Sequence, residues 1–167
     1  MSTLRVDNLR GQTADGINKY VVQVLQGEVL TEITNSSSSY GDVVTQKITP
    51  KYSTSKILIQ CSGCATPQTG NALYFKLLRD TTEIGSGTGG GYYNVIGALT
   101  NPGSSGGTVA FDVKGWSIQY LDSPSSTSEI TYKLQAAAVN GTAKIGGRQD
   151  NNDIAVPSRI TLMEIAQ

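Results

Sequence analysis

Two cysteines are the first feature of this chain that could do chemistry. Cys61-Ser-Gly-Cys64 has the spacing of a thioredoxin-type redox motif. That activity needs the first cysteine at the N-terminus of a helix following a strand, because the helix end lowers the thiol pKa. Here residues 57–61 alternate as a strand, no helical pattern follows, and no second cysteine pair completes a zinc site. We interpret Cys61 and Cys64 as partly buried thiols that project to opposite faces of a strand.

A glycine-rich segment and an acidic turn could bind a nucleotide and a metal ion, respectively. Residues 85–90 read Gly-Ser-Gly-Thr-Gly-Gly, but the dinucleotide pattern that they match requires a following helix to receive the pyrophosphate. A strand-like segment follows instead, so we interpret the glycines as a mobile loop. Residues 150–153 read Asp-Asn-Asn-Asp but lack the central glycine and terminal glutamate of a calcium loop. We interpret them as a solvated turn.

The sequence predicts no catalytic, cofactor-binding or metal-binding residues. The chain contains no histidine, so none of its serines or threonines has the usual general base. No Gly-x-Ser-x-Gly elbow joins a strand to a helix, and no pair of carboxylates is singled out. We therefore predict that the protein is not an enzyme and needs no cofactor, with a glycan depolymerase as the enzymatic alternative.

Composition narrows the class of protein further. The 167 residues, 38% of them apolar, suit a single globular domain. Thirteen basic residues balance thirteen acidic ones, which argues against binding to nucleic acid or to an anionic membrane. The charged fraction of 16% is well below the roughly 25% of typical domains, so Ser, Thr, Asn, Gln and Gly must cover much of the surface. We expect no signal peptide and no membrane-spanning segment.

Short alternating segments separated by turn residues predict an all-β protein. The candidate strands are residues 20–25, 29–34, 43–48, 56–62, 72–79, 92–98, 108–113, 116–121, 129–136, 142–145 and 159–165. Clusters of Gly, Ser, Pro and Asn lie between them, and no window keeps a helical period. This pattern predicts an antiparallel jelly-roll sandwich over residues 20–167, preceded by an extended N-terminal arm over residues 1–19.

The last predicted strand carries apolar side chains on both faces. Ile160 and Leu162 point to one side, while Met163 and Ile165 point to the other. An ordinary sandwich strand has one wet face, so we expect a neighbouring subunit to cover the second face. These four residues are the predicted trimer interface.

Two further sets of residues are candidates for contacts with other molecules. In the arm, Leu4, Val6 and Leu9 are the apolar side chains that could anchor it to another protein chain. In the predicted strand after the glycine loop, Tyr92 and Tyr93 are adjacent, so one of them should point outward as an exposed aromatic contact.

Several blocks of the chain resemble small virion proteins of marine tailed phages. They are STLRVDNLRG (residues 2–11), VVQVL (21–25), ITPKYSTSKILI (48–59), LLRDTTEI (77–84), YLDSP (120–124), ITYK (130–133) and ITLMEIA (160–166). The blocks span nearly the whole chain in the expected order. The resembled family is similar to the trimeric jelly-roll heads of complement and tumour necrosis factor proteins, and no catalytic residues come with it.

The resemblance implies a structural role on the surface of a phage particle. The first hypothesis is a homotrimer that decorates or cements the capsid through its N-terminal arm. The alternative is a receptor-binding head of a tail fibre or short fibre that binds a host-surface glycan or protein. In either case, we expect synthesis in the host cytoplasm, and the partners would be the chain itself and capsid or tail proteins.

Overall fold

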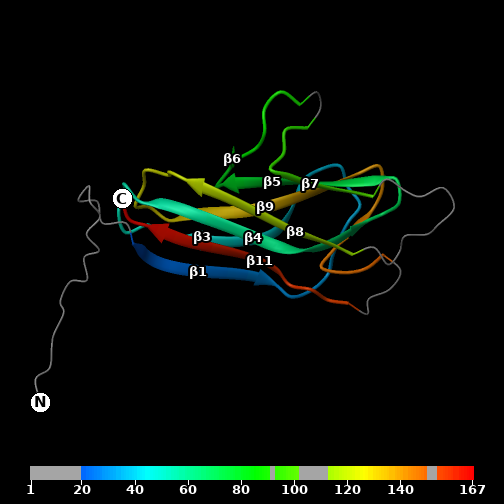
Figure 1. Ribbon diagram of the computed structural model, residues 1–167, viewed down its shortest axis with the longest axis horizontal. Coiled ribbons are helices and arrows are strands. Elements are labelled where there is room, and N and C mark those ends of the chain that lie inside the picture. The colour runs from blue at the N-terminus through cyan, green and yellow to red at the C-terminus, as the bar shows by residue number, and fades with distance from the viewer. Residues whose placement is uncertain (1–19, 91–92, 102–112, 150–153) are drawn as a thin grey trace, which may run out of the picture.

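The computed structural model describes residues 20–90, 93–101, 113–149 and 154–167, and these form two antiparallel sheets (Figure 1). The strands are β1 (Val21–Val29), β2 (Ile33–Asn35), β3 (Gly41–Ile48), β4 (Lys56–Pro67), β5 (Asn71–Arg79), β6 (Thr82–Ile84), β7 (Gly97–Asn101), β8 (Lys114–Asp122), β9 (Ile130–Val139), β10 (Ala143–Ile145) and β11 (Ser158–Ile165). Sheet A contains β1, β2, β4, β8, β10 and β11, and sheet B contains β3, β5, β6, β7 and β9. The predicted all-β class is confirmed.

The order of the strands is that of a jelly roll. In sheet A, β1, β11, β4 and β8 lie side by side, and in sheet B the order is β3, β9, β5 and β7. The pairs β1–β11, β3–β9, β4–β8 and β5–β7 are therefore nested, as in one long hairpin rolled into two layers. The short strands extend this frame, because β10 joins β4 to β2 and β6 pairs with the end of β5.

The core lies between the two sheets and follows the predicted alternation. Ile57 and Ile59 on β4 face Leu73 and Phe75 on β5 across the sandwich, and all four are essentially fully buried. Burying a side chain of this size stabilises the fold by roughly 1.5–3 kcal/mol. Trp116 packs on Phe75 with ring centroids 5.1 Å apart, which fills the interior near the start of β8.

Some predicted boundaries differ from the structure. The strand predicted over residues 92–98 is observed as β7, which starts only at Gly97, while Val95 lies in the loop before it and accepts a backbone hydrogen bond from Gly87 at 3.2 Å. The strand predicted at 56–62 continues to Pro67, because β10 pairs with its last residues. Nearly all of the strand predicted at 108–113, and the whole arm at 1–19, lie outside the described residues.

A buried polar cluster joins the two sheets near the end of β8. Asp122 accepts hydrogen bonds from Arg79 Nη1, 3.0 Å from both carboxylate oxygens, and from the Tyr132 hydroxyl at 2.7 Å. Burial raises the pKa of Tyr132, and the hydrogen bond to the charged Asp122 raises it further. The Tyr132 hydroxyl therefore stays protonated, and its hydrogen bond to Asp122 links sheet B to sheet A.

A second buried carboxylate, Glu164, faces the interior from β11. Its Oε1 accepts the backbone N–H groups of Lys51 at 2.7 Å and Tyr52 at 3.2 Å, and its Oε2 accepts Gln23 Nε2 at 2.6 Å. Burial alone would raise the pKa of Glu164, but these hydrogen bonds outweigh it and hold the pKa below its ordinary value. The ionised carboxylate thus ties β1 and the β3–β4 connection to the C-terminal strand.

We expect Glu164→Gln to lower the free energy of unfolding by about 1–3 kcal/mol near neutral pH, because an amide places N–H groups where donors already point. Since the native pKa lies below 4.5, the carboxylate stabilises the fold above that pH, and its contribution is lost as the pH falls through the native pKa. Urea unfolding should therefore show a difference between wild type and variant that shrinks from about pH 7 to about pH 3. A difference that does not change with pH would contradict this assignment.

Candidate assembly surface

The outer face of sheet A carries a continuous apolar row, which we call the apolar belt. It consists of Val24, Met163, Leu58 and Leu121, which are direct cross-strand partners on β1, β11, β4 and β8. Paired residues of an antiparallel sheet project to the same side, so the four side chains form one surface. Val24 is 54% exposed and Leu121 is 46% exposed, while the two central residues are half-buried. A large apolar surface that crosses four strands is typical of an interaction site.

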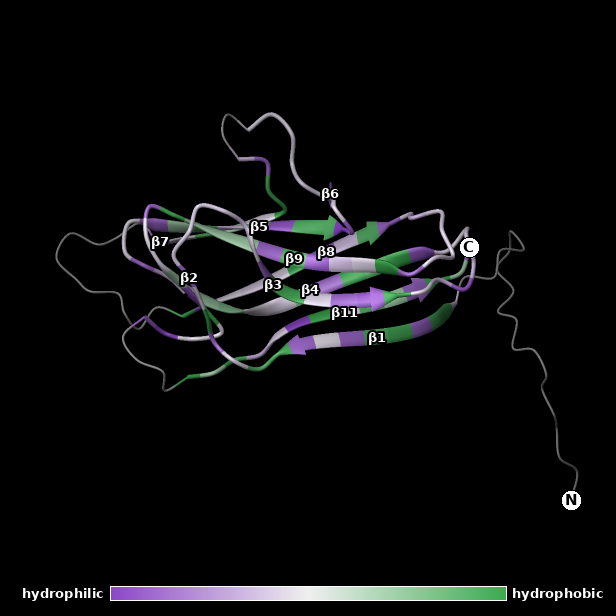
Figure 2. Cartoon of the chain, turned by 180° about the vertical axis from the view of Figure 1, so that it is seen from behind, coloured by the Kyte–Doolittle hydropathy of each residue, from purple (hydrophilic) through white to green (hydrophobic). Residues whose placement is uncertain are grey.

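The two rows beside the belt differ, since one is polar and uncharged and the other begins with apolar residues. One row consists of Gln26, Thr161, Gln60 and Gln119, again as direct cross-strand partners. On the other side of the belt, Ile165 pairs with Val21, which is 53% exposed, so the apolar surface extends toward the end of the sandwich where Tyr20 begins the described chain. In Figure 2, hydrophobic residues recur along β1 at this edge of sheet A.

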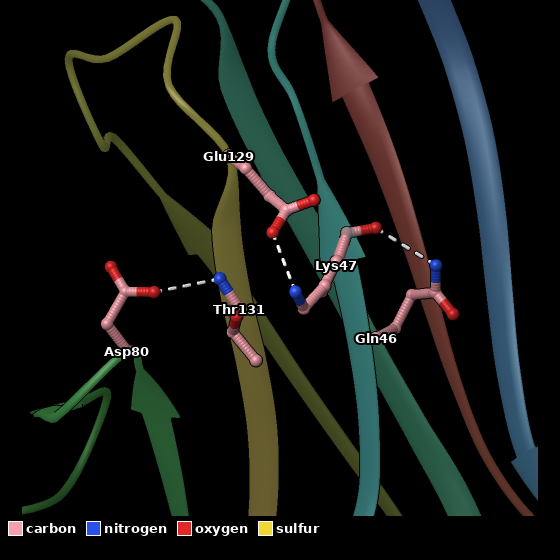
Figure 3. A network of polar contacts seen from close by, with 5 residues as sticks. All are labelled: Gln46, Lys47, Asp80, Glu129 and Thr131. Carbon is pink, nitrogen blue, oxygen red and sulfur yellow. Dashed lines mark hydrogen bonds and ion pairs between the residues drawn. The ribbon is translucent and has the colours of Figure 1, made fainter.

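The outer face of sheet B is built differently. Its ion pairs are Lys47–Glu129 at 2.7 Å, Lys133–Asp42 at 3.4 Å and Lys76–Glu83 at 2.6 Å, the first of which is drawn in Figure 3. Exposed pairs of this kind stabilise a fold by little, but they show that the surface remains hydrated. Sheet A also carries an exposed ion pair on its outer face, Arg159–Glu28 at 3.2 Å, but this pair lies beyond the row of Gln26 and Thr161, so the apolar belt itself contains no charge. Sheet A therefore has the face suited to a protein contact.

The β8 edge of sheet A is a second unusual surface. Strand β8 pairs with β4 through nine consecutive residue pairs without a bulge, and the described residues place no strand on its other side. Residues 115–121 include no charged residue and no proline, which are the usual means of preventing strand edges from associating. Such an edge is suited to a contact with another chain.

The four residues of the predicted trimer interface lie on opposite faces of β11, two facing outward and two facing the core. Met163 and Ile165 lie on the outer face of sheet A. Ile160 and Leu162 are fully buried between the sheets, so they belong to the protomer's own core and not to an outward surface. Sequence reasoning missed Val24, Leu58 and Leu121, because they belong to three different strands and only the cross-strand register brings them together.

The other predicted contact residues fall in two places. Tyr93 lies in the loop between β6 and β7 and is 44% exposed, which agrees with an outward aromatic side chain. Tyr92 and the arm residues Leu4, Val6 and Leu9 lie outside the described residues.

The environment of the two thiols is that of structural cysteines and not of a redox site. Cys61 and Cys64 are both buried and unbridged, and Cys61 lies in the core while Cys64 does not. Burial raises the pKa of Cys61 to about 12 and also raises the pKa of Cys64. Both therefore stay protonated near neutral pH, unlike the thiolate of a redox motif.

Within the described ranges, no group of three or more His, Cys, Asp and Glu residues is arranged to hold a metal ion. The same part of the chain has no helix with the length and apolar character needed to cross a membrane.

Comparison with known proteins adds a weak structural likeness. No protein-family model matches the chain, and no curated protein matches its sequence. Among solved structures, the chain is similar to the VP2 subviral particle of infectious bursal disease virus, with a TM-score of 0.41 and 10% identity. The alignment covers 99% of this chain and 44% of that chain, so this chain spans less than half of the viral protein's length. A TM-score of this size does not establish a shared fold.

We expect Met163→Asp to leave the protomer folded and to abolish self-association, because the new charge replaces the centre of the apolar belt while the core is unchanged. The matched control is Leu78→Asp, since Leu78 is a half-buried residue on the outer face of sheet B and is opposite Lys133. Light scattering should show a lower mass for the first variant only. Equal masses for Met163→Asp and wild type, with the wild type associated, would exclude the belt from the contact.

We expect neither thiol to react with iodoacetamide in the folded protein at about pH 8, because both are buried and protonated. Mass spectrometry should detect two added groups only after unfolding in urea, which serves as the control. Rapid labelling of the native protein would show that a thiol is accessible, and an unfolded protein that resists labelling would reveal a disulfide.

Proposed function

We propose that this chain is a non-enzymatic structural protein of a phage particle, in which copies of the chain associate through sheet A. The observation that supports this proposal is that sheet A has two surfaces suited to association. These are the apolar belt on its outer face and the β8 edge, which is uncharged over residues 115–121. Both features are costly to leave in water, and association would cover both.

The two surfaces differ in kind, which favours a closed ring of subunits. In a two-fold dimer, a contact between the β8 edge of one copy and the apolar belt of the other would have to occur twice within one interface. In a head-to-tail arrangement, each copy makes that contact once with the next copy, and the contacts close a ring when the rotation between copies is a whole fraction of a turn. The resemblance to trimeric jelly-roll heads suggests three subunits. In such a ring, the charged outer face of sheet B remains exposed to solvent.

Attachment to the particle is assigned to the N-terminal arm, residues 1–19. Tyr20 is the first described residue, and its carbonyl accepts a hydrogen bond of 3.0 Å from the Ala166 backbone N–H. The described chain therefore begins next to the C-terminal strand, at the end of sheet A that carries Val21 and Ile165. We infer that the arm pairs with a capsid or tail protein, and that the trimer decorates or cements the surface of the virion.

A receptor-binding head is the second candidate, and one observation favours it. The loop between β6 and β7 stands out from the body of the sandwich and carries the exposed Tyr93 (Figure 1). Projecting loops on a rigid sandwich often carry recognition residues. The number of copies per particle separates the two roles, because decoration needs hundreds of chains and a fibre tip needs a few dozen at most.

Deletion of residues 2–18 tests the assignment of the arm. We expect the truncated protein to fold and to give a light-scattering mass of three protomers, because every described strand lies beyond the deletion. The same protein should fail to co-sediment with particles that lack the wild-type protein, whereas the full chain should bind them. Co-sedimentation at wild-type occupancy would place the attachment in the sandwich, and a monomeric or dimeric mass of the full chain would contradict the ring.

A further inference from the structure

Three tyrosines gather on the outer face of sheet B beside an ion pair. Tyr74 and Lys76 lie on β5, Glu83 lies on β6, Tyr40 immediately precedes β3, and Tyr93 comes from the β6–β7 loop. We call these five residues the tyrosine cluster. Elsewhere on this face, the side chains described above are mainly charged, so the concentration of aromatic rings is local.

Contacts between the five side chains hold the cluster together. The rings of Tyr74 and Tyr93 have centroids 4.5 Å apart and are inclined by 32°. Lys76 Nζ lies 4.7 Å from the centre of the Tyr40 ring and 2.6 Å from Glu83 Oε2. The result is an aromatic surface with an ammonium group and a carboxylate at its side.

The loop that carries Tyr93 is fixed at its base. Gly85 has a φ of +71°, and a Cβ atom there would lie 2.8 Å from the Ile96 side chain, so only glycine fits where the loop leaves β6. The Gly87 N–H donates to the carbonyl of Val95 at 3.2 Å across the loop. These contacts hold the base of the loop, and the Tyr93 ring lies against Tyr74, an arrangement that reduces the entropic cost of binding.

One polar group of the cluster has an unmet requirement. The Tyr40 hydroxyl is buried and has no hydrogen-bond partner among the described residues. Burial raises the pKa of Tyr40; the nearby Lys76 lowers it, and the nearby Glu83, Tyr93 and Tyr74 raise it, so the hydroxyl stays protonated. An unpaired buried hydroxyl costs about 1–3 kcal/mol, and because this one is buried it is not itself a contact for a ligand on the surface.

We propose that the tyrosine cluster is a binding site for a neutral saccharide. A pyranose ring has a C–H face that packs on a tyrosine ring, and its hydroxyls both donate and accept hydrogen bonds. The tyrosine cluster has a matching group for each of these features. The exposed ring of Tyr93 can pack on the C–H face, Lys76 can donate a hydrogen bond to a hydroxyl, and Glu83 can accept one. The two charges cancel, so the site has no net preference for a charged ligand.

Other classes of ligand fit the cluster less well. An anion would be repelled by Glu83, and a cation would compete with Lys76, which already occupies the face of the Tyr40 ring. An extended peptide would need an open strand edge, but β5 is paired with β9 on one side and with β6 and β7 on the other.

Saturation-transfer NMR on the full chain tests the site directly, independently of assembly or particle attachment. The neutral probes are oligosaccharides built from glucose, galactose, mannose or rhamnose, and the charged probes are trigalacturonate and the chitosan trimer. We expect at least one neutral probe to bind with a Kd of about 1 mM and both charged probes to bind at least about 10-fold more weakly. Tyr93→Ala should weaken binding about 10-fold, whereas Tyr93→Phe, which keeps the ring, should change it by less than about 3-fold.

The control variant is Tyr52→Ala, because Tyr52 is similarly exposed, at 48%, but lies before β4 at the end of the sandwich, near Tyr20. Its affinity should equal that of wild type. Three results would overturn the proposal: no saturation transfer from any neutral probe at about 10 mM, tighter binding of a charged probe, or unchanged binding by both Tyr93→Ala and Tyr74→Ala. Circular dichroism of each variant separates loss of the site from loss of the fold.

Discussion

The register of β11 between β1 and β4 is the constraint on which the organisation of sheet A depends. Side chains alternate with a period of two, so a slip by one residue would exchange the inner and outer faces of the strand. Because β11 is apolar on both faces, hydrophobicity alone separates the two registers poorly. Glu164 separates them, since only the observed register brings its carboxylate to the N–H groups of Lys51 and Tyr52.

This register also decides which surfaces the protein offers to other molecules. With Glu164 inside, Met163 points outward and meets Val24 and Leu58 on the neighbouring strands. The same chain places ion pairs and tyrosines on the opposite face, over sheet B. The two outer faces therefore suit different contacts. The face of sheet A is suited to other copies of the chain, and the face of sheet B is suited to water and small ligands.

Much of the fold could be predicted from the sequence, because strand alternation depends on local spacing. The predicted alternation is observed on β4, β5 and β9, where every second residue over most of each strand is buried, and the nested order of the strands is that of the expected jelly roll. The start of β7 was missed, because the residues before Gly97 look β-forming but are held in a loop. The surfaces were harder to predict, because the apolar belt combines residues that are far apart in the chain: Val24 and its partner Met163 are separated by 139 positions.

Both ends of the described fold meet at one pole of the sandwich, where Ala166 binds Tyr20. A short linker between these two residues would close the chain into a circle with little strain, so the protein is a natural candidate for circular permutation. At the opposite pole, the β4–β5 turn is secured by the Gly70 N–H, which donates to the Asn101 carbonyl at 2.8 Å. Peptides inserted at that pole would project away from both ends of the chain and would leave the joined ends undisturbed.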